Sequence, residues 1–120
     1  MAFGTLKADT LTHSTAGSLT TDYVVNGSAK AWIDYNQVAN TTDGSFNVSS
    51  VSDDATGRFT YTMVNAMDSA NWSMPYAANA FVGMINDVLS STQGKCRSRD
   101  AATSDTDATQ NCTCNHGDLA

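Results

Sequence analysis

The feature that most constrains the fold is the segment SFNVSSVSDDATGRFTYTMVNAM, residues 45–67, in which apolar and polar residues alternate on both sides of a polar turn. Alternation with a period of two is typical of strands that bury one face. We therefore predict an antiparallel hairpin with one buried face and a bulge at Ser50–Val51, where the period breaks. The residues expected on the buried face are Phe46, Val48, Phe59, Tyr61 and Met63.

The composition agrees with a β-rich fold. All 12 acidic residues among the 120 are aspartate, and Thr, Ser, Asn and Gly are abundant. Thr favours strands, whereas Asn, Asp and Gly favour turns and caps over helix interiors. A chain of this length corresponds to about one domain. We expect an all-β domain over residues 23–120, built as an antiparallel β-sandwich or small barrel and preceded by an extended N-terminal segment.

Residues 1–22 form a segment with few large apolar side chains among Thr, Ser and Gly. Such a segment cannot bury enough apolar surface to fold alone, so it needs a neighbour to become ordered. We predict that it is a docking or trimerisation segment. Its regularly placed apolar residues are Phe3, Leu6, Leu11 and Leu19.

Further strands follow from local patterns. Asn26–Gly27 between apolar runs predicts a tight hairpin turn, because both residues tolerate positive φ. In the strand after it, Trp32 falls on the polar face. Either another part of the protein covers this face, or Trp32 is an exposed aromatic anchor. The first alternative is favoured, because large aromatic side chains usually pack. Residues 81–91 fit either helical spacing or a strand, and the β-rich neighbourhood favours a strand. Two short polar strands are expected at Cys96–Asp100 and Asn111–His116.

Charge and hydropathy narrow the function classes. The net charge of -6 gives no positive footprint for nucleic acid. No apolar stretch is long enough to cross a membrane, and no secretory signal is evident at the start. We expect a soluble protein made in the cytosol, in which the three cysteines are reduced thiols.

The sharpest candidate for metal chemistry is Cys112-Thr-Cys114-Asn-His116, because a strand aims all three ligand types at one face, with Cys96 conceivably opposite. Zinc motifs usually space paired cysteines by two to four residues on a knuckle, rather than by one residue along a strand. Reduced cysteine also serves as a small buried hydrophobe. We therefore predict no metal ion and no cofactor.

Catalytic signatures are also missing. The chain has no Gly-x-Ser-x-Gly, no phosphate-binding glycine loop and no glutamate. His13 lies in the segment without a core, and a pair among Asp34, Asp68 and Asp87 would need to meet in space to cleave a glycoside. We predict that the protein is not an enzyme and has no catalytic residues.

The candidate contact patch consists of Trp72 and Tyr76, which flank the only proline, Pro75. Proline confines a strand at this position to an edge or a bend. Large aromatic groups beside such a bend can contact a partner through their exposed faces. The alternative is that both rings fill the core beneath the bend.

The strings GTLKADTLTHSTAGSLTTDYVVNGSAKAW and SFNVSSVSDDATGRFTYTMVNAM, with the ending HGDLA, also carry a likeness. In them the chain resembles short virion surface proteins and tail-fibre terminal domains of tailed bacteriophages, especially phages of marine bacteria. The likeness covers most of the chain and lies chiefly in the first seventy residues. The sequence departs from the pattern in its cysteine-bearing C-terminal strands, where apolar residues are expected.

The resemblance implies a phage structural protein, made in the host cytoplasm and exposed on the virion, most simply as a homotrimeric tail fibre or fibre-like appendage. Its expected partners are other copies of itself, other virion proteins and a host receptor or glycan. Two alternatives stay open: a capsid or tail decoration protein, and a glycan-cleaving or metal-dependent module.

Overall fold

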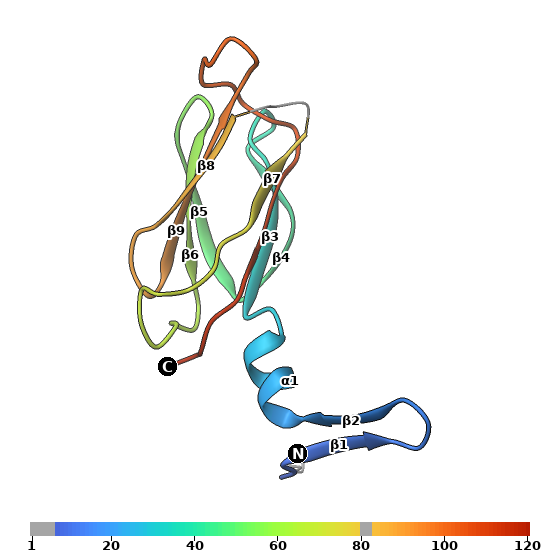
Figure 1. Ribbon diagram of the computed structural model, residues 1–120. Helices are drawn as coiled ribbons and strands as arrows, with labels where there is room; N and C mark the ends of the chain where they lie inside the picture. The colour runs from blue at the N-terminus through green and yellow to red at the C-terminus, as the bar shows by residue number, and fades with distance from the viewer. Residues whose placement is uncertain (1–6, 80–82) are drawn as a thin grey trace.

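Two four-stranded antiparallel sheets pack face to face in the computed structural model, which describes residues 7–79 and 83–120 (Figure 1). Neither sheet closes into a barrel, so the all-β prediction is confirmed in its sandwich form. A hairpin and a short helix precede the sandwich and project from one of its ends.

The first sheet has the strand order β4-β3-β10-β7. Its strands are β3 (Ala31–Asn36), β4 (Thr41–Phe46), β7 (Tyr76–Ala78) and β10 (Asn111–Asn115). The second sheet has the order β5-β6-β9-β8. Its strands are β5 (Val48–Ala55), β6 (Arg58–Met63), β8 (Gly83–Val88) and β9 (Gln93–Arg99). Three predictions are thereby confirmed. Residues 83–88 of the segment expected as a strand form β8, while residues 81 and 82 lie outside the described residues. β9 and β10 cover most of the two polar segments, and β7, next to the proline, is an edge strand.

The predicted hairpin is β5–β6, which reverses at Gly57 with a φ of 66°. Its ladder shifts between Val48 and Ser50, so the bulge lies one residue earlier than expected. Most of the predicted buried face is present. Phe59, Tyr61 and Met63 are buried, and Val48 packs against the core.

Phe46 is the exception, and the prediction that it is buried is wrong. It ends β4 in the first sheet, pairs with Trp32 and leaves 56% of its surface exposed. The next residue, Asn47, has a φ of 57°. This left-handed residue redirects the chain into the second sheet, so the alternation does not continue from Phe46 to Val48.

The core lies between the two sheets and combines inward residues from both. The rings of Tyr35 and Phe59 meet with centroids 4.9 Å apart, and those of Phe59 and Tyr76 with centroids 6.2 Å apart in an edge-to-face arrangement. β10 contributes polar groups to this interior: Asn111 Nδ2 donates to the carbonyl of Tyr35 at 3.0 Å, whereas Asn115 Nδ2 has no partner among the described residues. Hydrogen bonds of this kind offset most of the cost of burying polar groups.

The tight turn predicted at Asn26–Gly27 is wrong, because these residues end the helix α1 (Thr21–Gly27). A strand at Tyr23–Val25 would need a place beside β3, but β3 already pairs with β4 on one side and β10 on the other. Before the helix, β1 (Thr10–His13) and β2 (Gly17–Thr20) form a separate two-stranded hairpin. We call residues 7–27 the arm; α1 spans the boundary expected between residues 22 and 23.

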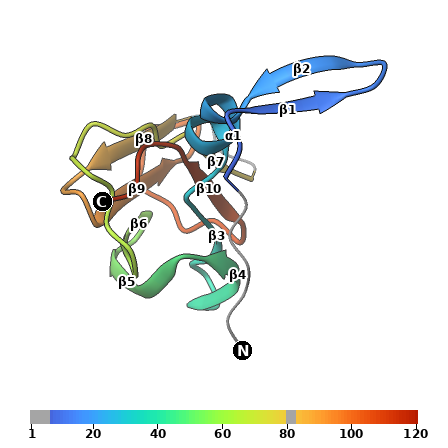
Figure 2. The same ribbon diagram turned by 90° about the horizontal axis from the view of Figure 1, so that it is seen from below.

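The sandwich has two distinct ends (Figure 1). The arm leaves from one, the arm end, where the C-terminus also lies. The other, the far end, carries the β3–β4 and β5–β6 turns and the loop Asp100–Gln110. Seen from below in Figure 2, β1 and β2 reach sideways beyond the sheets. The whole molecule is 52 Å in its longest dimension.

Candidate functional site

The arm exposes an unusual share of large apolar side chains. Leu11 and Leu19 stand opposite each other in the β1–β2 ladder and are 43% and 45% exposed. Helix α1 adds exposed Tyr23, Val24 and Val25. Contiguous exposed apolar groups are typical of surfaces that contact another molecule.

The arm has internal ties that fix its shape. The N–H of Thr21 donates to the carbonyl of Asp9 at 3.0 Å, and its hydroxyl donates to the carbonyl of Ala8 at 2.8 Å. These bonds hold the start of α1 against the chain before β1. Lys30 Nζ donates to the carbonyl of Val25 near the other end of the helix. An open hollow of about 490 Å³ lies between the hairpin and the helix, lined by Lys7, Ala8, Asp9, Leu11, Thr21, Val24 and Val25.

A second exposed apolar group lies on the sandwich. Trp32, next to the start of β3, and Phe46, at the end of β4, are directly paired on the outer face of the first sheet. The Trp32 ring lies over Gly44, where an added Cβ would come within 3.1 Å of its Cζ3 atom. Trp32 keeps 42% of its surface exposed. In a single chain it is therefore an exposed aromatic anchor, and the favoured alternative, in which this face is covered, does not describe it. Exposed Val64 follows nearby, since its N–H donates to the carbonyl of Asn47.

The predicted contact patch at Trp72 and Tyr76 is not formed by exposed rings. Trp72 is 7% exposed, and its Nε1 donates to the carbonyl of Ser90 at 3.0 Å. Tyr76 is half-buried against the core, where its hydroxyl donates to Asn111 Oδ1 at 2.6 Å and burial raises its pKa. The alternative, in which both rings fill the core beneath the bend, therefore describes them better.

The cysteine and histidine cluster is split between the two sheets. Cys112, Cys114 and His116 alternate with buried residues of β10 and so share its outer face, as predicted; Cys114 Sγ lies 3.6 Å from His116 Nε2. Cys96, on β9, points into the core, where burial raises its pKa. The pKa of Cys112 is also raised, by burial and then by Asp34. Within the described ranges no three Cys, His or Asp side chains approach closely enough to hold a metal ion.

The aspartates considered for glycoside cleavage are not brought together. Asp34 projects from the outer face of the first sheet, and Asp87 from β8 of the second sheet, on the opposite side of the sandwich. Asp68 lies in the exposed connection after β6. The side chain of His13 lies outside the described residues. These positions leave the two-carboxylate mechanism without a pair.

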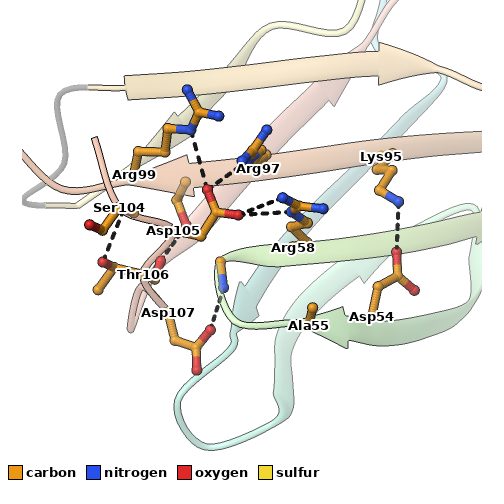
Figure 3. Close-up of polar contacts among 12 residues, drawn as sticks. Asp54, Ala55, Arg58, Lys95, Arg97, Arg99, Ser104, Asp105, Thr106 and Asp107 are labelled. Carbon is orange, nitrogen blue, oxygen red and sulfur yellow. Dashed lines mark hydrogen bonds and ion pairs between the residues drawn. The ribbon is translucent and has the colours of Figure 1, made fainter. Parts of the chain in front are cut away.

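A charged cluster at the far end was not predicted (Figure 3). Asp105 accepts hydrogen bonds from three arginines. Its Oδ1 accepts from Arg97 Nε at 2.7 Å and from Arg99 Nε at 3.2 Å. Its Oδ2 accepts from Arg58 Nε at 2.9 Å. The hydrogen bond from Arg97, followed by those from Arg58 and Arg99, holds the Asp105 pKa below its usual range. The alternating run KCRSR could have predicted this cluster, since on a strand it places Lys95, Arg97 and Arg99 on one face of β9.

The cluster fastens the loop Asp100–Gln110 onto the second sheet. Asp107 Oδ1 accepts the N–H of Gly57 at 2.6 Å, and Ser98 Oγ donates to the carbonyl of Thr106 at 2.7 Å. A Cβ at Gly57 would lie 2.6 Å from both the Ser98 oxygen and the Thr106 nitrogen. The far end is thus a fixed polar surface, in contrast to the apolar arm end.

No protein family, curated protein or solved structure shows significant similarity to this chain. Among the described residues, α1 is the single helix, and it is too short to traverse a lipid bilayer.

Proposed function

We propose that this chain is a structural component of a phage particle, a homotrimeric tail fibre or fibre-like appendage that docks or assembles through its arm. The observation that carries the assembly role is the exposure of Leu11, Leu19, Tyr23, Val24 and Val25 on an arm that projects from the sandwich. The virion assignment rests on the resemblance of the sequence to phage surface proteins.

Burial of the exposed apolar side chains of the arm would stabilise an assembly. Fully burying a Leu or Val side chain stabilises an assembly by about 1.5–3 kcal/mol relative to leaving it in water. An arm that leaves several such groups exposed gains free energy when they pack against another surface. Trp32 and Phe46 lie at the same end of the sandwich and extend the surface available to a neighbour. Aromatic groups are enriched at the centres of protein interfaces.

A homotrimer suits this arrangement. In a closed cyclic assembly, each arm contacts both neighbours around one axis, and every copy buries the same groups. The far ends then point away from the shared base. A host receptor or glycan would meet the far end, where polar Ser, Thr and Asp residues predominate.

The main alternative is a capsid or tail decoration protein, which would use the same arm to bind a different virion protein. In that case the isolated chain stays monomeric and becomes ordered on the particle. The glycan-cleaving or metal-dependent alternative gains no support from the positions of Asp34, Asp87 and the cysteines.

The experiment that tests the proposal is mass spectrometry of purified particles from cells that produce the protein, combined with labelling by an antibody raised against residues 100–110. We expect the chain in the particle at stoichiometric amounts, with the antibody bound to intact particles because the far end faces outward. Absence of the chain from purified particles contradicts the virion role. Its presence without antibody binding contradicts the proposed orientation.

A further inference from the structure

The outer face of the second sheet gathers most of the positive charge of an acidic protein. Four of the six Lys and Arg residues lie there: Arg58, Lys95, Arg97 and Arg99. They project from β6 and β9, as Figure 3 shows. Along β9, Lys95, Arg97 and Arg99 recur at every second residue, a separation of about 7 Å per step on a strand.

The carboxylates nearby do not use all the donors of this cluster. Asp105 takes the Nε protons of Arg97 and Arg99 and two donors of Arg58, while Asp54 pairs with Lys95 at 3.5 Å. The terminal Nη groups of Arg97 and Arg99 donate no hydrogen bond to any acceptor in the described part of the chain. Their side chains are 28% and 30% exposed.

The charge is also only partly balanced. On this face the four cations Arg58, Lys95, Arg97 and Arg99 stand against three carboxylates, those of Asp54, Asp87 and Asp105, which leaves an excess of one positive charge. One arginine is enough to fasten a carboxylate, and a loop clamp alone does not account for three. Guanidinium groups recognise carboxylate and sulfate groups through paired, parallel N–H donors.

The shape and surroundings narrow the ligand. An open groove of about 370 Å³ is lined by Arg58, Asp87, Leu89, Lys95, Cys96 and Arg97. Its neighbours on β6 are Thr60 and Thr62, and the described residues of this face include no aromatic ring on which a nucleic-acid base could stack. Among its described lining residues, Leu89 is an apolar side chain, and the others include two arginines, a lysine and an aspartate. An open groove with guanidinium and ammonium donors, next to the partly exposed Thr60 and Thr62, suits an acidic sugar chain.

We propose that the outer face of β6 and β9 binds a carboxylated or sulfated polysaccharide, whose anionic groups contact the free Nη donors of Arg97 and Arg99. Asp105 and Asp87 limit the net charge of the face, which makes the contact local and specific rather than a diffuse attraction. This site is independent of the virion role, since it concerns the surface of the isolated chain.

The test is titration of the purified full chain with heparin, polygalacturonate, neutral dextran and inorganic sulfate at about 0.05 M salt, where surface charges are weakly screened. We expect binding of one or both acidic polymers and none of dextran. The double variant Arg97→Gln/Arg99→Gln should lose affinity by about tenfold or more. The matched single variants are Arg97→Gln, which should also lose affinity, and Lys7→Gln, which removes the same charge elsewhere and should change affinity less than about twofold. Asp105→Asn should strengthen binding.

Three results overturn the proposal: no binding of either acidic polymer, equal losses in the β9 variant and the control, or competition by dextran. Inhibition by inorganic sulfate at equal anion concentration would show that a free oxyanion, and not a sugar chain, is the ligand. Arg97→Lys/Arg99→Lys keeps the charge but removes the paired donors. It serves if the glutamine variant fails to fold, and it too should weaken binding. A negative outcome leaves the virion proposal untouched, because particle content and polymer binding are measured separately.

Discussion

The hydroxyl of Tyr61 on β6 donates a hydrogen bond of 2.9 Å to Asn115 Oδ1 on β10, across the interior between the two sheets. Both side chains are fully buried. The same oxygen accepts a hydrogen bond from Thr113 Oγ1 at 2.9 Å. Because the hydrogen bond offsets the cost of burying both polar groups, this contact favours one relative position of the two sheets.

Removal of that hydroxyl should weaken the sandwich. Tyr61→Phe keeps the ring and deletes the donor, and we expect it to lower the free energy of unfolding by about 0.5–1.5 kcal/mol. Urea denaturation of both proteins gives the difference. Tyr23→Phe is the control, because Tyr23 is 70% exposed and its hydroxyl is not in the core. Equal stability of Tyr61→Phe and the parent chain would contradict the role given to this bond.

Two phenylalanines separate core from surface. Phe59 is fully buried, so Phe59→Ala should cost about 3–5 kcal/mol. Phe46 carries the same side chain in the exposed position, so Phe46→Ala should change the stability of the single chain by less than about 0.5 kcal/mol. Denaturant melts under conditions where the protein is dissociated distinguish the two. Similar costs at both positions would mean that Phe46 is covered in the folded chain.

An element could be predicted from the sequence when the interactions that form it join residues close together in the chain. The β5–β6 hairpin could be predicted because its pattern and turn are adjacent in sequence. The place of Phe46 could not, because the pattern does not reveal that Asn47 adopts a positive φ and moves the chain from one sheet to the other.

The sites show the same limit. The proline at residue 75 predicted an edge strand correctly, but it did not tell which atoms surround Trp72, which packs in the core beside Ser90. The spacing of Arg97 and Arg99, two residues apart, could predict that both side chains lie on one face of a strand. Their partner Asp105 comes from a loop whose path depends on contacts with Gly57 and β9, and no local pattern contains those contacts.

The β5–β6 turn should tolerate no side chain at Gly57. Gly57→Ala combines a φ of 66° with contacts of 2.6 Å to the backbone of Ser98 and Thr106, so we expect a loss of more than about 1 kcal/mol. Gly27→Ala is the matched control at the end of α1, where nothing lies within 4 Å of the added Cβ. It should be neutral or slightly stabilising. Thermal melts of both variants measure the contrast, and a neutral Gly57→Ala would mean that the loop Asp100–Gln110 is not held against this turn.

The Asp105 cluster should give the protein an acid-sensitive contribution to stability. Its pKa is lower in the folded chain than the usual value of about 3.9. A carboxyl group whose pKa is lower in the folded chain stabilises the fold at any pH above its pKa in the unfolded chain. This contribution is lost as the pH falls below about 4 toward the pKa of the folded chain. Asp105→Asn lacks the contribution at every pH.

Urea melts of the parent chain and Asp105→Asn from pH 7 to pH 2 test this expectation. The parent chain should be more stable at neutral pH, and the difference between the two should shrink below about pH 4. A difference that is constant with pH would show that the arginines do not stabilise the ionised form of Asp105.

The central claim is that the arm is an assembly surface, and light scattering of the recombinant chain tests it most directly. We expect the parent chain to have the mass of a trimer, and the Leu11→Ser/Leu19→Ser variant to have that of a monomer with an unchanged circular dichroism spectrum. Val38→Ser is the control, because Val38 is equally apolar and exposed but lies in the β3–β4 turn at the far end, and it should leave the trimer intact. A stable monomeric parent chain whose arm resists proteolysis would contradict the account.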